Sequence, residues 1–295
     1  MMKLKNSATA KTMTALIYAF IGLFTVLCLA PFWLMIIGSL TKESSILRDG
    51  YQLWPQEWSL TAYQVLFASE RVTRSYKVTL EVTLLGTAIS MLLTSMLAYA
   101  LAVRGPKYTR FIALFVVFTM LFTGGLVPWY ILITRYLRLQ NTIFALTLPY
   151  AISPFWMFLM RNHFRSIPES IMESAYIDGA GDLLILFRIM LPLSLPTLAT
   201  IGLFYALMYW NDWYLSLMFI ERRELFPLQF LLRSLVSNLM NVAISLNPKM
   251  TVMTEVPAYS VRMSTAVITI GPIVAFYPFI QKYFVKGLTV GAIKG

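Results

Sequence analysis

The chain has 295 residues, of which 58% are apolar and only 13% are charged, and its mean hydropathy is +0.70. This composition excludes an ordinary soluble domain and is typical of an integral membrane protein. The net charge of +11 comes from basic residues scattered at the ends of apolar runs. Because no nucleic-acid-binding motif accompanies them, membrane headgroups and topology explain this charge better than nucleic acid does. The single cysteine, Cys28, has no intrachain partner for a disulfide.

Six apolar runs are long enough to cross a bilayer core, which needs about 20 residues. They cover residues 15–40, 78–103, 111–133, 143–160, 193–220 and 263–284. The first run follows three lysines but is too long for the core of a signal peptide, so we expect a retained membrane helix. Prolines inside several runs predict bent helices, and Gly124 and Gly125 in the third run predict a further bend or a close helix contact. The expected fold is an all-α integral membrane protein with six helices, in which residues 1–14 precede one membrane domain, residues 15–295.

An even number of spans places both termini on one side of the membrane. Lys and Arg residues divide evenly between the two sides, but they are denser in the shorter segments on the terminal side. This density favours cytoplasmic termini. On the outer side, residues 41–77 carry Trp54 and Trp58 as expected interfacial anchors, and Ser59 is expected to cap a short helix that ends at Phe67.

The second outer segment covers residues 221–262. Its leucines recur at helical spacing, and Arg233 is one of the polar residues between them. The pattern predicts an amphipathic helix that lies at the outer interface or against a partner, because a charge at its centre argues against a span.

The cytoplasmic segment, residues 166–192, is compact and punctuated by glycine. Ser166 as a capping residue and Pro168 in a first turn predict a short helix that begins near Glu169. Gly179, followed by a second glycine, is expected to end this helix.

A second short helix is predicted over residues 183–190. Asp182 is its expected cap, and Pro192 is expected to close it because proline cannot continue the hydrogen-bond ladder. The segment also has small side chains that leave room for the close approach of another protein, at Ser174, Ala175, Gly179 and Ala180. It is therefore predicted to be a docking surface.

Asn211 and Asp212, in the stretch YWNDWYL, are the clearest polar residues inside a predicted span. A carboxylate costs ~2.5–3.5 kcal/mol at the bilayer centre on insertion scales, so Asp212 should face the bundle interior, a wet cavity or a partner charge. It either lines a substrate path, or it hydrogen-bonds a neighbouring helix or reaches interfacial water. Aromatic residues near the outer halves of the spans can stack on sugar rings, although an aromatic belt produces the same pattern; they are Trp129, Tyr130, Tyr209, Trp210 and Trp213.

The sequence contains no GxxxxGK[ST] loop, no GxSxG elbow and no HExxH pair. Its only histidine, His163, has no second ligand nearby that would make a metal site. The chain is therefore expected to be no enzyme and to hold no metal or cofactor, so any ATP must bind a different subunit.

Several residues of the cytoplasmic segment agree in type and spacing with a known motif. They are Glu173, Ala175, Gly179, Ile189, Leu191 and Pro192, joined by Asp178, Ala180, Phe187 and Pro196. This pattern resembles the EAA motif, the cytoplasmic loop of permease subunits in ABC importers; Ser174 replaces the second alanine of its name. The stretches FTGGLVPWYIL, NTIFALTLPY, YWNDWYLSLMFI, FPLQFLLRSL and YPFIQKYFVKGLTVGAIKG resemble MalG-type carbohydrate permeases, in the branch that handles complex oligosaccharides.

The resemblance implies a six-helix type I ABC importer permease fold in a bacterial cytoplasmic (inner) membrane. The EAA segment would form a coupling helix seated in a cleft of an ATPase, with contact or support from Glu173, Ser174, Ala175, Asp178, Gly179, Ala180, Ile189 and Pro192. The C-terminal tail would reach between two ATPase subunits through Gly291, Lys294 and Gly295. The implied partners are a second homologous permease, two ATPase copies that bind ATP and Mg, an extracellular or periplasmic solute-binding protein and an oligosaccharide.

The outer segments carry more basic than acidic residues. This surplus suits an acidic oligosaccharide, such as the uronates that alginate-type importers of this branch carry. Neutral oligosaccharides in the same architecture are the alternative. Two other classes fit less well: a membrane enzyme acting on lipid-linked saccharides with Asp212 or Glu81 as base, and a secondary transporter, which would need more intramembrane carboxylates than the chain has.

Overall fold

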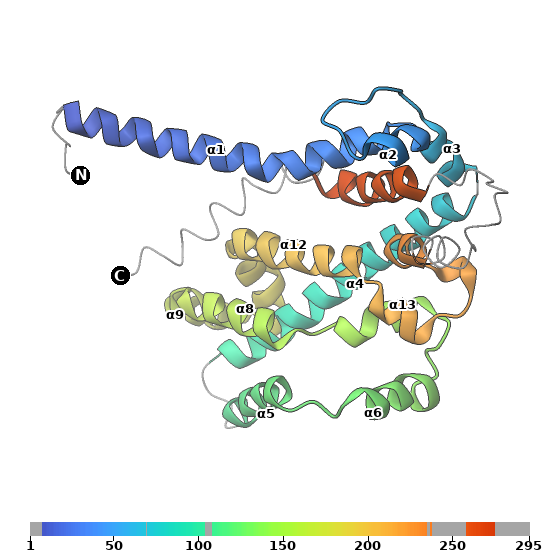
Figure 1. The fold of residues 1–295 in the computed structure, drawn as a ribbon. Helices are drawn as coiled ribbons and strands as arrows, with labels where there is room; N and C mark the ends of the chain where they lie inside the picture. The colour runs from blue at the N-terminus through green and yellow to red at the C-terminus, as the bar shows by residue number, and fades with distance from the viewer. Residues whose placement is uncertain (1–7, 69, 104–107, 235–236, 238–257, 275–295) are drawn as a thin grey trace. The chain divides into compact units, whose positions relative to one another are not determined.

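The computed structural model describes residues 8–68, 70–103, 108–234, 237 and 258–274. All regular secondary structure in these residues is helical (Figure 1). The chain divides into two compact units, residues 1–69 with 236–271 and residues 70–235 with 272–295.

The first unit contains α1 (Ala8–Ser39), a helix of 32 residues with Pro31 inside it. From Lys11 onward, α1 is one of two helices in the described residues that are long and apolar enough to cross a membrane by themselves. Most of its apolar side chains are exposed. This is the pattern expected of a helix whose backbone polar groups bond internally while its side chains face lipid.

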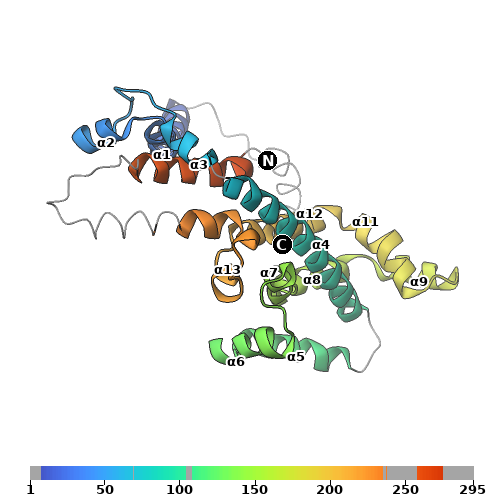
Figure 2. The same ribbon diagram turned by 90° about the vertical axis from the view of Figure 1, so that its right-hand side faces the viewer.

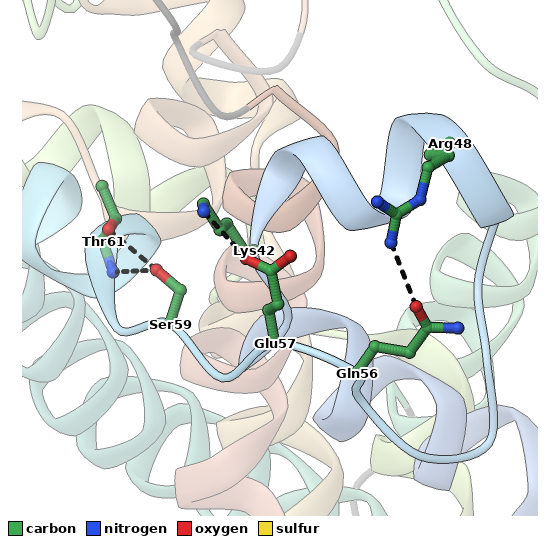
Figure 3. A network of polar contacts seen from close by, with 6 residues as sticks. All are labelled: Lys42, Arg48, Gln56, Glu57, Ser59 and Thr61. Atoms are coloured by element: carbon green, nitrogen blue, oxygen red, sulfur yellow. Dashed lines mark hydrogen bonds and ion pairs between the residues drawn. The ribbon is translucent and has the colours of Figure 1, made fainter.

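Two short helices follow α1, namely α2 (Glu43–Asp49) and α3 (Thr61–Phe67). The Ser59 hydroxyl accepts a hydrogen bond from the Thr61 backbone N–H at 3.2 Å (Figure 3). Such a bond satisfies one of the free N–H groups at a helix start. The predicted short helix ending at Phe67 is confirmed, but Leu60 holds its capping position, and Ser59 bonds the first N–H from one residue further back.

The loop between α2 and α3 is held by polar side chains (Figure 3). Lys42 Nζ lies 2.8 Å from Glu57 Oε2 in an exposed ion pair. Arg48 Nη2 donates a hydrogen bond to Gln56 Oε1 at 3.1 Å. Both contacts tie α2 and the residue that precedes it to the far side of the loop.

Trp54 and Trp58, the expected interfacial anchors, are both exposed. The ring of Trp54 lies 6.5 Å from that of Trp33 and 5.7 Å from that of Trp58. Trp33 also donates a hydrogen bond from Nε1 to the Leu53 carbonyl at 2.9 Å. The three indoles therefore form one exposed aromatic group beside α1.

Residues 258–274 form a helix that a side chain of α2 caps. The Glu43 carboxylate accepts hydrogen bonds from the backbone N–H groups of Tyr259 and Ser260, both at 2.9 Å. A negative charge at a helix N-terminus is stabilising because the N–H groups there are unpaired and the helix dipole is positive. Figures 1 and 2 show this helix, in red, beside the end of α1.

The second unit is organised around α4 (Glu70–Ala102), the other long apolar helix. It packs against α8 (Pro154–Ser166) and α12 (Leu195–Asn211), and the three helices contribute most of the buried core. Figure 1 shows α4 running behind α8 and α12.

Small and hydroxyl-bearing residues of α4 form its contact with α12. Ser90 Oγ lies 2.8 Å from the Tyr209 hydroxyl, and Thr94 Oγ1 lies 2.7 Å from the Tyr205 hydroxyl. A Cβ atom at Gly86 would lie only 2.7 Å from the Tyr209 ring. Because Gly86, Ser90 and Thr94 are four residues apart, they form one stripe of the small-residue type that packs membrane helices.

Three pairs of apolar helices are bent. The angles are 114° between α5 (Thr109–Leu121) and Leu126–Tyr136, 54° between Ile143–Tyr150 and Pro154–Ser166, and 89° between Asp182–Leu193 and Leu195–Asn211. Gly125 has a φ of 84°, which glycine adopts without steric cost. The bend predicted at Gly124 and Gly125 is confirmed.

The predicted apolar runs can be compared with these helices. Two runs coincide with α1 and α4, and three fall on the bent pairs, so the described residues hold up to five spans if each pair is one span. The sixth predicted run, residues 263–284, begins in the helix 258–274, and its remainder lies outside the described residues.

After α12 the chain continues in α13 (Tyr214–Phe219), a 3-10 turn (Arg223–Leu225) and a helix over residues 228–234. In this last helix, Leu228, Leu231 and Leu232 are buried and Arg233 is exposed, as the amphipathic pattern predicts. Residues 238–257 of the predicted amphipathic segment lie outside the described part of the chain.

Candidate functional site

The first helix of the segment predicted to be cytoplasmic is α9 (Glu169–Ile177), which begins at the predicted residue. Pro168 stands in the capping position and has a φ of −55°. Ser166 does not cap α9, contrary to prediction. It is the last residue of α8, and its hydroxyl donates a hydrogen bond to the His163 carbonyl at 2.7 Å. A hydroxyl that bonds back to its own helix is not available to the next one.

Gly179 ends α9 in the arrangement known as a Schellman motif. The Ala180 N–H donates to the Ala175 carbonyl at 2.9 Å, and the Gly179 N–H donates to the Tyr176 carbonyl at 3.0 Å. This pair of bonds requires a left-handed residue after the cap, and Gly179 has a φ of 81°. Glycine is thus needed here for the backbone conformation, in addition to any need for space.

The second helix differs from the prediction. It begins as α10 (Asp182–Ile185), continues as a π-helical turn (Leu186–Met190) and ends in α11 (Leu191–Leu193). Pro192 lies inside this run and does not close it at Met190. Pro192 stands in the first turn of α11, where its missing N–H and fixed φ are tolerated. We call residues 169–193 the coupling segment.

Asp182 also differs from its predicted role, because it is the first residue of α10 and Gly181 holds the capping position. Its Oδ1 atom accepts hydrogen bonds from the Tyr176 hydroxyl at 2.5 Å and from the Tyr99 hydroxyl at 3.2 Å. The first of these bonds is the largest cause that raises the pKa of Tyr176, so this hydroxyl stays a donor at neutral pH. The Asp182 cluster (Tyr99, Tyr176 and Asp182) therefore joins α9 and α10 to the end of α4.

The residues predicted to contact an ATPase differ in exposure. Those on the open surface are Glu173, Ser174, Asp178, Gly179 and Pro192, whereas Ala180 and Ile189 are half-buried. Ala175 is only 7% exposed and packs in the core. Its methyl group packs α9 against the bundle. A docking partner would therefore contact the exposed residues of α9 and not Ala175.

Large apolar side chains are exposed on the coupling segment, and sequence reasoning gave them no role there. Ile177 is 86% exposed, and Leu183, Leu184 and Phe187 are also exposed. Ile177 lies outside the candidate spans, and an exposed apolar group in such a place marks an interaction surface. The signal was present in the sequence as bulky apolar residues placed next to the two glycines.

Two arginines of α8 lie beside the coupling segment. Arg161 Nε and Arg165 Nη2 both donate to the Leu101 carbonyl, at 2.9 Å and 3.4 Å. Cations at a helix C-terminus satisfy free carbonyls and oppose the helix dipole, so they fix the end of α4. A cavity of about 350 Å³ lies next to them and is lined by Ala102, Phe164, Arg165, Ser166, Ile167, Pro168, Glu169 and Met172.

The predicted substrate-path aromatics fall into two groups. Trp129, on α6 (Leu126–Ile131), stacks on Tyr214 with the ring centroids 6.3 Å apart. Tyr130 stacks on Phe219 at 5.8 Å. The rings of Trp213 and Tyr214 meet edge to face at 6.0 Å. Three of the five predicted residues therefore belong to one aromatic cluster formed by α6 and α13.

Tyr209 and Trp210 lie elsewhere, inside the helix packing. Tyr209 is 1% exposed, and its hydroxyl is 2.8 Å from both Ser90 Oγ and the Thr147 carbonyl oxygen. Trp210 is 9% exposed, with its ring 6.5 Å from that of Tyr76. In this conformation a sugar does not reach the Tyr209 ring.

Asp212 lies at the break between α12 and α13. Its Oδ2 atom accepts the Leu215 N–H at 3.1 Å, and the Tyr150 side chain hydrogen-bonds the same carboxyl group. The carboxylate thus stabilises the first turn of α13 and ties it to a neighbouring helix, as one of the predicted alternatives has it, while a place on a substrate path stays a prediction. The neighbouring Asn211 is exposed and accepts a hydrogen bond from Gln229 Nε2 at 3.2 Å.

Two further site predictions concern the C-terminal tail and a metal site. Gly291, Lys294 and Gly295 lie outside the described residues. Within the described residues, no group of three or more His, Cys, Asp or Glu side chains is placed to hold a metal ion.

Known proteins resemble this chain over nearly its whole length, although no family model matches it. The Polygalacturonan/rhamnogalacturonan transport system permease protein YtcP of Bacillus subtilis is 38% identical over 283 residues, 95% of this chain and 97% of that protein. The Arabinooligosaccharides transport system permease protein AraQ of Halalkalibacterium halodurans is 29% identical over 299 residues and covers both chains fully.

A solved structure agrees with these relatives. It is a bacterial ABC transporter involved in the import of the acidic polysaccharide alginate, and it matches with a TM-score of 0.82 and 28% identity over 94% of this chain and 98% of that chain. The predicted all-α ABC importer permease fold is confirmed. Since permease subunits leave ATP hydrolysis to a partner ATPase, the chain is a transport subunit and not an enzyme. It belongs to the multi-pass inner-membrane permease subunits of carbohydrate ABC importers.

Proposed function

We propose that this chain is the permease subunit through which an ATP-driven importer moves an acidic, uronate-type oligosaccharide. It would pair with a second, homologous permease, two ATPase copies that bind ATP and Mg, and an external solute-binding protein, with both termini in the cytoplasm. The observation that carries the proposal is the coupling segment, an exposed helix pair whose first helix, α9, lies outside the candidate spans.

Its construction suits the transmission of force. Ala175 anchors α9 in the core, and the Asp182 cluster fastens both helices of the segment to α4. A push on the exposed face through Ile177 or Leu183 therefore displaces the bundle instead of bending the segment. ATP shifts the inward and outward populations only by its differential affinity for them, so a stiff connection to the nucleotide site is required.

The C-terminal residues Gly291, Lys294 and Gly295 are proposed as a second contact with the ATPase pair. This proposal rests on the family resemblance of the tail. Glu173, Ser174, Asp178 and Gly179 form the exposed part of the first contact, with Ala180, Ile189 and Pro192 at its margin.

The substrate class is supported by the relatives and by charge. One relative is named for the transport of polygalacturonan, which is a polymer of galacturonic acid. The structural neighbour is involved in the import of alginate, which is described as an acidic polysaccharide. The basic surplus of the outer segments fits such cargo. Neutral oligosaccharides are the second candidate substrate, because other relatives are named for the transport of arabinooligosaccharides and alpha-glucosides.

The test is purification of the tagged chain with its co-expressed partners, followed by reconstitution in proteoliposomes. We expect an ATPase to co-purify, and we expect uptake of oligogalacturonides that requires both ATP and the solute-binding protein. An ATPase subunit with its catalytic glutamate replaced is the control. Uptake of neutral oligosaccharides alone would overturn the acidic substrate, and turnover by the isolated chain would overturn the importer.

A further inference from the structure

Four side chains at the break after α12 form a polar group that neither the fold nor the coupling segment requires. Asn211 and Trp213 come from the break, and Gln229 and Arg233 come from the helix over residues 228–234. Gln229 Nε2 donates to Asn211 Oδ1 at 3.2 Å, and the Arg233 guanidinium carbon lies 3.7 Å from the centroid of the Trp213 ring. We call this group the Arg233 patch.

Arg233 is exposed, and no carboxylate of the described residues lies within salt-bridge distance of it. Its position over Trp213 is a cation–π contact, which attracts the cation to the ring face without using its N–H groups. A guanidinium held against a ring presents those N–H groups at its edge, in the fork that matches a planar carboxylate. The side chain is therefore oriented before any ligand arrives.

The surroundings indicate that this face meets water or a polar ligand and not lipid. An arginine that only reaches for the membrane surface extends away from the apolar chain. Arg233 is instead held over an indole, beside the exposed amide of Asn211. Polar groups that are exposed within an otherwise apolar region mark a substrate or ion path by default.

An aromatic row continues from the patch. Trp213 contacts Tyr214 at 6.0 Å, and Tyr214 stacks on Trp129 at 6.3 Å. Sugar-binding surfaces combine such apolar rings with a few polar groups that fix orientation. One charged fork, one amide pair and a row of rings are together suited to a saccharide chain that bears carboxylates.

From these contacts we infer that Arg233, held on Trp213, recognises the carboxylate of a uronate-type oligosaccharide on the transport path and so determines specificity for acidic over neutral sugars. This inference rests on the proposed function, because it needs an acidic cargo.

The experiment compares oligogalacturonides with their carboxyl-reduced counterparts in proteoliposomes that hold the complete complex and the solute-binding protein. For Arg233→Gln we expect uptake of the acidic probe to fall about tenfold or more, since a charge-assisted hydrogen bond is lost. Uptake of the reduced probe should change by less than about twofold. Arg233→Lys should retain more acidic uptake than Arg233→Gln because it keeps the charge. Arg222→Gln, which removes another exposed charge nearby in the sequence, should behave as wild type.

The outcomes separate the two proposals. If wild type carries the acidic probe and Arg233→Gln leaves it unchanged, or lowers both probes equally, the specificity role is wrong and the proposed function stands. If wild type carries the reduced probe and not the acidic one, the acidic cargo itself is wrong. If wild type carries only the acidic probe, uptake by Arg233→Lys at least about threefold above Arg233→Gln supports recognition of charge, and equal uptake overturns it.

Discussion

The coupling segment and the Arg233 patch both lie next to α12, yet they are held in different ways. The end of α9 in the coupling segment is closed by main-chain hydrogen bonds at Gly179, and the segment is fixed to the bundle by the buried Ala175 and by the Asp182 cluster. The Arg233 patch is fixed by two side-chain contacts between exposed residues. A segment that is held by buried residues and main-chain hydrogen bonds resists force. Contacts between exposed side chains can instead be exchanged for contacts with a ligand at little cost. The first arrangement suits transmission and the second suits recognition.

Replacing Gly179 should have the largest effect. Gly179→Leu places a bulky side chain on the exposed surface. It also puts leucine at a left-handed backbone position, which costs an L-residue ~1–2 kcal/mol. We expect binding-protein-dependent uptake to be abolished while the chain stays in the membrane, measured by transport in proteoliposomes and by immunoblotting of membranes.

Two variants separate the causes at Gly179. Gly179→Asn tolerates the left-handed conformation, so loss of uptake in this variant points to steric exclusion of the partner. Gly22→Ala, which adds a methyl group where no atom lies within 4 Å and lies outside the coupling segment, should transport normally. Normal transport by Gly179→Leu would remove the coupling role of the segment.

Gly86→Val tests the helix packing that lies beneath both regions. Its Cβ would lie 2.7 Å from the Tyr209 ring, which cannot swing aside because its hydroxyl is bonded to Ser90 and Thr147. Overpacking of this kind costs ~1–3 kcal/mol. We expect a lower thermal midpoint of the purified complex and weaker uptake of every probe. Gly22→Val, where no atom lies within 4 Å, is the control; an equal loss there would contradict the packing argument.

Asp182→Ala should affect coupling and spare selectivity. It removes the carboxylate that accepts hydrogen bonds from the Tyr99 and Tyr176 hydroxyls, and a hydrogen bond to a charged group contributes ~1.5–3 kcal/mol. We expect uptake per ATP hydrolysed to fall while the ratio of acidic to reduced probe is unchanged. Tyr99→Phe combined with Asp182→Ala should lose little more than Asp182→Ala alone, and additive losses would show that the two residues act independently.

The Lys42–Glu57 pair should have the smallest effect, and it depends on pH. Its hydrogen bond to Lys42 is the main cause that holds the pKa of Glu57 below the ordinary value of 4.5. Because the folded pKa is lower than the unfolded one, the stabilisation is present above the unfolded value and is lost as the pH falls through the folded value. Glu57→Gln should lower the thermal midpoint slightly at pH 7 and not at acidic pH, and 1 M salt should shrink the difference. A pH-independent difference would contradict this assignment.

The predictable parts of the molecule are those with local causes. Pro168 and Gly179 set their own φ angles, so the start and end of α9 follow from neighbouring residues. Asp182 was assigned as a cap because its partner Tyr99 is 83 residues away and no local pattern points to it. The break between α12 and α13 at Asp212 is not predicted, because the apolar run continues through it. Hydropathy does not show which backbone N–H group a carboxylate will bind.

The hydroxyl stripe on α4 has a consequence for how the chain is made. Ser90 is bonded to Tyr209, which is 119 residues later in the sequence. At a synthesis rate of ~5–20 residues per second, about 6 to 24 s pass between the two residues on the ribosome. During that interval α4 carries hydroxyl groups into the bilayer before their partner exists. Ser90 and Thr94 must then bond back to carbonyls of their own helix and exchange these bonds when α12 arrives. Assembly of this permease therefore includes an interval of seconds in which α4 is complete and its partner α12 is not yet synthesised.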